Sequence, residues 1–148
     1  MVRRLWWCLP LMAVERKARG HVWKAIERTR WHRRVYLPTM VQLIDQHCNP
    51  KKEVLQLIDA CAQRGITMAI YSDYGCIEEK LKVLGLDSSQ FALLISSPAL
   101  GERKPSAAAA RKILDLLHAD PQTTLFVGDR EEKDGASARA VGAKFFLV

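Results

Sequence analysis

The sequence predicts an α/β fold in which a doubly wound parallel sheet carries helices on its faces, preceded by a helical N-terminal piece. From Lys51 onward, amphipathic helix patterns alternate with short apolar runs, and the connections between them are short. Strand, helix and strand joined in this way form parallel neighbours through right-handed crossovers. In addition, the polar residues best suited to chemistry follow the ends of the apolar runs, where ligands bind in such sheets.

The expected elements follow in a regular order. The first helix has apolar residues at i, i+3, i+4 and i+7, and Gly65 ends it as a C-cap. Three further helices are expected; their apolar stripes lie at Ile77, Leu81 and Leu84, at Ala110, Ile113, Leu114 and Leu117, and in the Ala-rich stretch before Gly142. The buried strands are predicted at residues 66–71, 91–95, 125–127 and 143–148. A polar loop is expected from Ser96 to Pro105, and a helix break at Asp120-Pro121.

The charge distribution divides the chain into two parts. Residues 1–36 hold ten Lys or Arg, two acidic residues and all four Trp, whereas residues 37–148 hold thirteen basic and fourteen acidic residues. We therefore expect a basic, Trp-rich segment over residues 1–50, which includes a basic amphipathic helix, followed by an α/β core over residues 51–148. The concentrated charge weakens the general argument that a protein with net charge +7 binds nucleic acid.

Cysteine and hydropathy patterns predict a cytoplasmic protein without a membrane span. The four cysteines form no CxxC pair and have no metal-ligand spacing with the histidines. Arg3-Arg4 followed by an apolar stretch resembles a signal peptide, but Trp and Pro residues interrupt it and no small-residue cleavage site follows. No apolar run has the length needed to cross a bilayer.

Four residues after strand ends are candidates for chemistry. Asp129 and Asp134, in Gly-Asp-x-x-x-x-Asp, present two carboxylates to one hard cation such as Mg²⁺; the alternative is a turn residue and a helix N-cap. Lys104, in Lys-Pro, offers a compact positive charge to a phosphoryl group, or is simply a solvated lysine. Ser72 offers a hydroxyl and a backbone N–H to a phosphate oxygen, or performs ordinary turn chemistry.

Taken in order, these residues resemble the second, third and fourth motifs of the haloacid dehalogenase-like (HAD) superfamily, whose core is a Rossmannoid α/β domain. The resemblance runs from about Val54 to Val148. Because an insertion in this family often forms a helical cap over the site, the resemblance makes the segment of residues 1–50 a candidate cap remnant. It implies Mg²⁺-dependent hydrolysis of phosphate monoesters through an aspartyl-phosphate, with a small phosphorylated substrate. Ser72 would hold phosphoryl oxygens, Lys104 would offset negative charge, and Asp129 with Asp134 would bind Mg²⁺.

The first HAD motif, Asp-x-Asp, is absent before Ser72. The only earlier aspartates are Asp45 and Asp59, and neither fits the pattern; the run Leu5–Pro10 would place Cys8 and Pro10 where the family has carboxylates. This departure removes the nucleophile, the acid–base group and a metal ligand, so we expect weak Mg²⁺ binding and no hydrolysis. It also removes the central strand of the sheet, whose two neighbours would be left with unpaired backbone groups or filled by another segment.

Three functional hypotheses remain open at this point. The first is a HAD phosphatase whose sequence is truncated before the later motifs. The second is a non-catalytic binding or regulatory relic of the fold. The third and least favoured is nucleic-acid binding through the basic, Trp-bearing arm.

Overall fold

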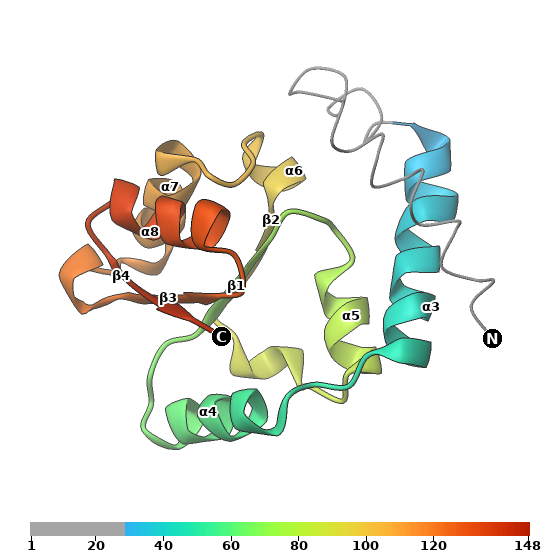
Figure 1. Ribbon diagram of the computed structural model, residues 1–148, viewed down its shortest axis with the longest axis horizontal. Coiled ribbons are helices and arrows are strands. Elements are labelled where there is room, and N and C mark those ends of the chain that lie inside the picture. Colours follow the sequence, from blue (N-terminus) through green and yellow to red (C-terminus); the bar gives the residue numbers. More distant parts are fainter. Residues whose placement is uncertain (1–28) are drawn as a thin grey trace. The chain divides into compact units, whose positions relative to one another are not determined.

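The computed structural model of the chain describes residues 29–148 (Figure 1). Its contacts form two compact units, residues 1–40 and 41–148, and the boundary falls within helix α3 (Leu37–His47). In the first unit, the described residues form the π-helical turn η2 (His32–Tyr36) and the start of α3. The proposed strand at residues 5–10 and most of the proposed basic helix lie outside the described residues. The division at residue 50 stays a prediction.

The second unit alternates helices and strands, as the sequence predicts. Short 3-10 turns, η3 (Ser88–Gln90) and η4 (Pro121–Thr123), precede β2 and β3. The order of the main elements is α4 (Lys52–Gln63), β1 (Ala69–Ser72), α5 (Ile77–Val83), β2 (Leu93–Ser96), α6 (Ser97–Leu100), α7 (Ala107–Leu117), β3 (Leu125–Gly128), the π-helical turn η5 (Glu131–Gly135), α8 (Ala136–Ala140) and β4 (Lys144–Leu147).

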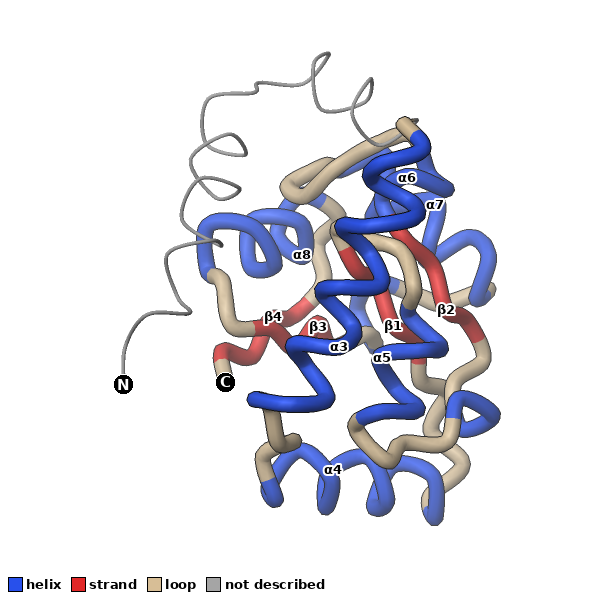
Figure 2. The backbone as a smooth tube through the Cα atoms, turned by 90° about the vertical axis from the view of Figure 1, so that its right-hand side faces the viewer, coloured by secondary structure: helices blue, strands red, loops and turns tan. Residues whose placement is uncertain are grey.

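The four strands pair in parallel, in two sheets of two strands each (Figure 2). In the first sheet β1 pairs with β2, and Ser72 at the end of one strand lies beside Ser96 at the end of the other. In the second sheet β3 pairs with β4. Parallel strands joined through helices confirm the predicted α/β class.

The sheet lacks a strand between β1 and β3 in the part of the chain that the structure describes. Within residues 29–148, each of these two strands has a hydrogen-bonded neighbour on one side only. The two alternatives, unpaired edges or another segment between these strands, both stay open, because the run Leu5–Pro10 lies outside the described residues. Side-chain ion pairs, described below, join the carboxyl ends of the two sheets.

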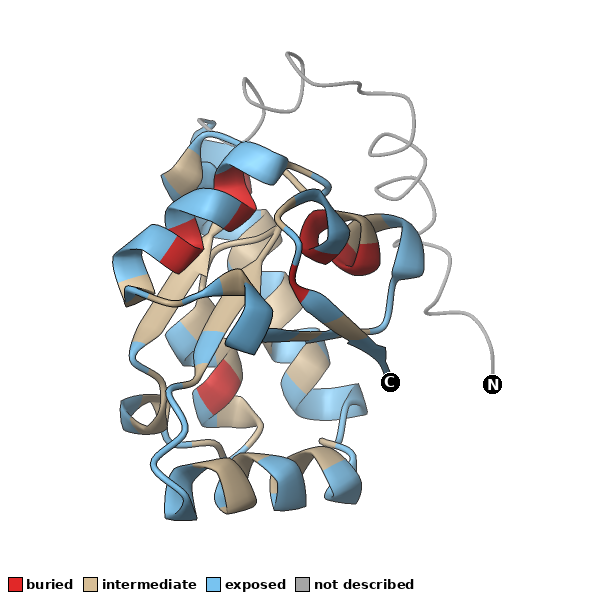
Figure 3. Ribbon diagram, turned by 90° about the vertical axis from the view of Figure 1, so that its left-hand side faces the viewer, coloured by how far each residue is buried: buried red, intermediate tan, exposed pale blue. Residues whose placement is uncertain are grey.

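The core lies mainly where α7 and α8 cover one face of β3 and β4 (Figures 1 and 3). Leu125, Val127 and Phe146 point to the opposite face of these strands and are each about half exposed. The second sheet is therefore covered on one face only by the described residues. The buried apolar residues are Leu81 on α5, Ala109, Ala110, Ile113 and Leu114 on α7, Ala138 on α8 and Ala143 before β4.

Several boundaries differ from the expectations. The first strand begins at Ala69 rather than at residue 66, because Ile66 is half exposed and follows the chain reversal at Gly65, whose φ is +65°. The loop expected after β2 contains the short helix α6. Helix α7 ends before the expected break, since His118 adopts a left-handed conformation that caps it.

Within residues 29–148, no helix combines the length and the apolar character that crossing a bilayer requires.

Candidate functional site

Ser72 is placed by the end of β1, where the strand turns into the connection to α5. Its Oγ accepts a hydrogen bond from the backbone N–H of Tyr74, at 3.2 Å. This side-chain-to-backbone bond two residues along the chain is a common turn device of serine. Ser72 therefore performs the turn chemistry expected as its alternative role, at the strand end where a ligand is expected.

Lys104 lies at the end of the connection between α6 and α7, and its side chain is largely buried. The ammonium Nζ lies 2.7 Å from Oδ1 of Asp134, and the exposed fractions of the two side chains are 16% and 12%. The same Nζ lies 4.6 Å from the centre of the Tyr71 ring, within range of a cation–π contact. The interpretation of Lys104 as an ordinary solvated lysine is therefore wrong.

Asp129 and Asp134 occupy different environments although both follow β3. Asp129 comes directly after Gly128 and is exposed, whereas Asp134 is buried within η5. Asp134 does not cap the following helix: Gly135 stands at that position, and no side chain caps it. The N-cap interpretation of Asp134 is therefore wrong, because the carboxylate is held by Lys104 from a distant part of the chain.

This arrangement requires glycine at position 128 because a side chain would not fit there, and not because of the backbone conformation. A Cβ atom at position 128 would lie 2.6–2.7 Å from three side-chain atoms of Asp134. Such distances are shorter than any ordinary van der Waals contact. The glycine at the end of β3 thus lets the Asp134 carboxylate approach the strand.

Asp73, which directly follows Ser72 after β1, is the most connected carboxylate of the site. Its Oδ1 accepts hydrogen bonds from the Ser97 hydroxyl at 2.8 Å and from the Lys104 backbone N–H at 3.2 Å. Its Oδ2 lies 3.3 Å from the ammonium of Lys133. The only signal in the sequence is its position directly after Ser72, which does not reveal its distant partners.

The environment of Asp73 keeps its carboxyl group ionised. Burial raises the pKa of this group, but the hydrogen bonds from Ser97 and Lys104 and the positive charge of Lys133 outweigh burial and lower the pKa below its usual value. A lowered pKa means that the folded state favours the charged form. Asp73 therefore stabilises the fold at neutral pH, and this contribution is lost as the pH falls through its folded pKa.

We call Asp73, Ser97, Lys104, Lys133 and Asp134 the ionic cluster. It joins the carboxyl ends of β1 and β2 to the segment after β3, across the place where no described strand lies. Its two ammonium groups and two carboxylates balance in charge. Of the four residues singled out from the sequence, Lys104 and Asp134 belong to the cluster, and Ser72 directly precedes its member Asp73. Asp129 is exposed at the end of β3 and is not a member of the cluster.

The family resemblance implies that Asp129 and Asp134 would bind Mg²⁺. The Asp134 carboxylate is already bonded to Lys104, and no group of three or more His, Cys, Asp or Glu side chains gathers within residues 29–148. Mg²⁺ demands near-octahedral geometry and is usually bound through one or two carboxylates together with waters and substrate phosphates. Because Lys104 engages the Asp134 carboxylate, Asp129 is the remaining carboxylate of the motif, and the described residues do not fit a tightly held Mg²⁺ ion.

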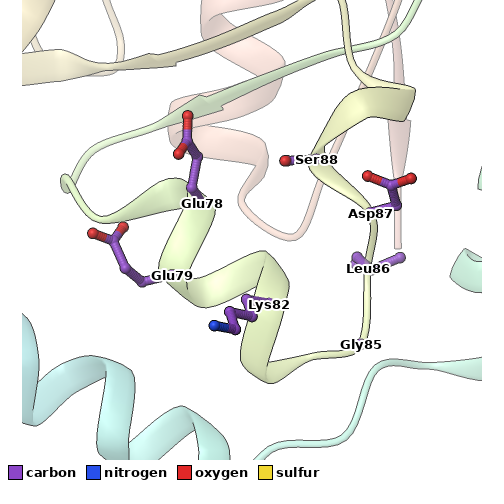
Figure 4. A pocket seen from close by; sticks show the side chains of 7 residues that line it. All are labelled: Glu78, Glu79, Lys82, Gly85, Leu86, Asp87 and Ser88. Carbon is purple, nitrogen blue, oxygen red and sulfur yellow. The ribbon is translucent and has the colours of Figure 1, made fainter.

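A separate hollow of about 510 Å³ lies along α5 and the connection that follows it (Figure 4). It is shallow and open to solvent. Its lining comes from α5 and the connection to η3: Glu78, Glu79, Lys82, Gly85, Leu86, Asp87 and Ser88. None of these residues belongs to the ionic cluster, so the hollow is not part of the candidate site.

The chain is similar to curated proteins over most of its length. It is 31% identical over 117 residues to haloacid dehalogenase-like hydrolase domain-containing protein 3 of Bos taurus, which covers 75% of this chain and 46% of the relative. It is also 31% identical over 106 residues to phosphoglycolate phosphatase of Aquifex aeolicus (strain VF5), covering 69% of this chain and 48% of the relative. The chain thus spans about half the length of these relatives.

Solved structures share the fold. A HAD phosphatase from Thermococcus onnurineus matches with a TM-score of 0.61 at 20% identity, covering 66% of this chain and 46% of that structure. A 2-haloacid dehalogenase from Pseudomonas syringae pv. Tomato DC3000 matches with a TM-score of 0.56 at 24% identity, covering 65% and 40%. The family described as haloacid dehalogenase-like hydrolase matches residues 15–148. The resemblance is therefore confirmed, and the chain belongs to the haloacid dehalogenase-like hydrolase family.

Proposed function

We propose that this chain binds the phosphoryl group of a small phosphorylated molecule beside the ionic cluster and does not hydrolyse it. The proposal rests on the largely buried ammonium group of Lys104. This group belongs to the ionic cluster, which also contains Asp73, the residue directly after Ser72. A lysine in such a place is a point charge suited to phosphate. The names of the relatives from Aquifex aeolicus and Thermococcus onnurineus support phosphate esters as the ligand class.

The proposed lack of hydrolysis follows from the carboxylates that this chain offers. The 148 residues contain no Asp-x-Asp pattern. Near Lys104, the Asp73 carboxylate accepts three donors and the Asp134 carboxylate is paired with the lysine, so both are stabilised as bonded anions. A nucleophile needs an available lone pair and an activating neighbour. Neither carboxylate meets this requirement, and Mg²⁺ is expected to bind weakly at Asp129.

Binding is tested first, by titrating the protein with inorganic phosphate in a calorimeter. We expect Lys104→Ala to weaken binding by about tenfold or more, because the variant loses a charge-assisted contact to the phosphate oxygens. Ser72→Ala, which disturbs no ion pair, is expected to weaken it by a smaller factor. Lys112→Ala, which removes an exposed charge on α7, is the matched control and should leave the affinity unchanged. Equal affinities for Lys104→Ala and the control would contradict the proposal.

Hydrolysis is tested separately, with 4-nitrophenyl phosphate and millimolar Mg²⁺. The release of nitrophenolate should not exceed that of a blank without protein. A rate that depends on Mg²⁺ and disappears in Asp129→Ala would show that the site is catalytically complete, and the proposed inactivity would then be wrong. The hydrolysis test is independent of the phosphate titration, because phosphate binding is expected of an active enzyme and of an inactive protein alike.

A further inference from the structure

We propose that Asp73 is a specificity-determining residue of the phosphate site, where its carboxylate disfavours doubly charged anions and shifts the preference toward singly charged ones. The inference rests on the proposed function and adds the charge class of the ligand. Asp73 follows Ser72 directly, so its negative charge lies at the strand end that is expected to receive the phosphoryl group.

Asp73 occupies hydrogen-bond donors that an incoming oxyanion would otherwise use. The Ser97 hydroxyl, which is 1% exposed, and the backbone N–H of Lys104 both point to its Oδ1. The Lys133 ammonium is directed to Oδ2, at 3.3 Å. An incoming oxyanion must therefore compete with the Asp73 carboxylate for these donors, because the carboxylate already accepts the hydrogen bonds that an oxyanion would accept.

The charges around Ser72 favour this effect. Within the ionic cluster the carboxylates of Asp73 and Asp134 balance the ammonium groups of Lys104 and Lys133, so the cluster keeps no net positive charge for an incoming anion. A ligand with two negative charges is repelled about twice as strongly by the Asp73 carboxylate as a ligand with one, because the interaction energy is proportional to the charge. Replacing Asp73 with Asn leaves the cluster with one net positive charge while it keeps an oxygen that accepts from Ser97 and Lys104.

The experiment compares two probes on the full chain: inorganic phosphate at about pH 8, where it carries close to two charges, and dimethyl phosphate, which carries one. We expect Asp73→Asn to tighten inorganic phosphate binding by about tenfold and dimethyl phosphate binding by about threefold. Asp115→Asn removes an exposed carboxylate of α7 and is the matched control for net charge; it should change neither affinity by more than about twofold.

A second variant distinguishes the proposed specificity-determining role of Asp73 from a purely structural role. If Asp73→Asn frees the Lys133 ammonium, then Lys133→Met should weaken phosphate binding more strongly in the Asp73→Asn protein than in the wild type. Far-ultraviolet circular dichroism establishes that each variant is folded. A variant that only loosens the cluster would weaken both probes alike and show no such coupling to Lys133, and this outcome would overturn the inference.

The outcomes also separate this inference from the proposed function. If wild type binds phosphate through Lys104 but Asp73→Asn binds neither probe more tightly, the inference is wrong while the proposed function stands. If neither protein binds phosphate at any accessible concentration, the proposed function itself fails, and the inference fails with it.

Discussion

Gly128→Ala is expected to lower the free energy of unfolding by about 2–3 kcal/mol. The added methyl group would lie 2.6 Å from the Asp134 carboxylate, which is buried and held by Lys104, so neither partner moves without loss. Displacing Asp134 would also lengthen its 2.7 Å contact with Lys104. Urea unfolding followed by circular dichroism measures the change.

Gly135→Ala is the matched control for this substitution. A Cβ there also comes close to a side chain, but the neighbour is the carboxyl end of Glu131, which is flexible and half exposed. Gly135 has helical dihedral angles, so alanine gains helix propensity worth up to about 1 kcal/mol. We expect its stability to stay within about 1 kcal/mol of wild type. Similar losses in both variants would show that the approach of Asp134 to β3 is unimportant.

Asp134→Ala is expected to lower the free energy of unfolding by about 2–3 kcal/mol, because it leaves the Lys104 ammonium in a largely buried place without its carboxylate. The loss is smaller than for a fully buried pair, since part of the charge regains water. If Lys104 is replaced by Met in the same protein, most of the stability should return, because no buried charge then remains unpaired. Thermal and urea unfolding of the two single variants and the double variant complete the cycle.

Glu132→Ala provides the comparison with an exposed ion pair. Glu132 lies 3.0 Å from Arg130, at about the distance found in the cluster, but the exposed fractions of the two side chains are 53% and 66%. Exposed pairs contribute about 0–1 kcal/mol, so this variant should be nearly as stable as wild type. If Asp134→Ala cost no more than Glu132→Ala, the ionic cluster would not hold the two sheets together.

Local patterns in the sequence were sufficient to predict the helices and strands of residues 51–148. Apolar spacing identified α4, α5 and α7, and short apolar runs identified all four described strands. Boundaries were less certain, because hydrophobicity does not show where a chain leaves the sheet: Ile66 is apolar and yet half exposed before β1. The family and the candidate residues also followed from the sequence, because short motifs carry them.

The contacts of those residues depended on the tertiary structure. Ser72, Lys104, Asp129 and Asp134 were identified from the sequence as strand-end or loop residues, but the Lys104–Asp134 pair joins residues 30 positions apart. The sequence did not identify Asp73 as a candidate residue, because each of its partners lies at least 24 positions away and no local pattern encodes such contacts. Residue types and spacing were enough to single out the groups that are candidates for binding a ligand. Only the folded arrangement decided that those groups bond to one another, because charges separated along the chain interact once folding has brought them within a few ångströms and removed the water between them.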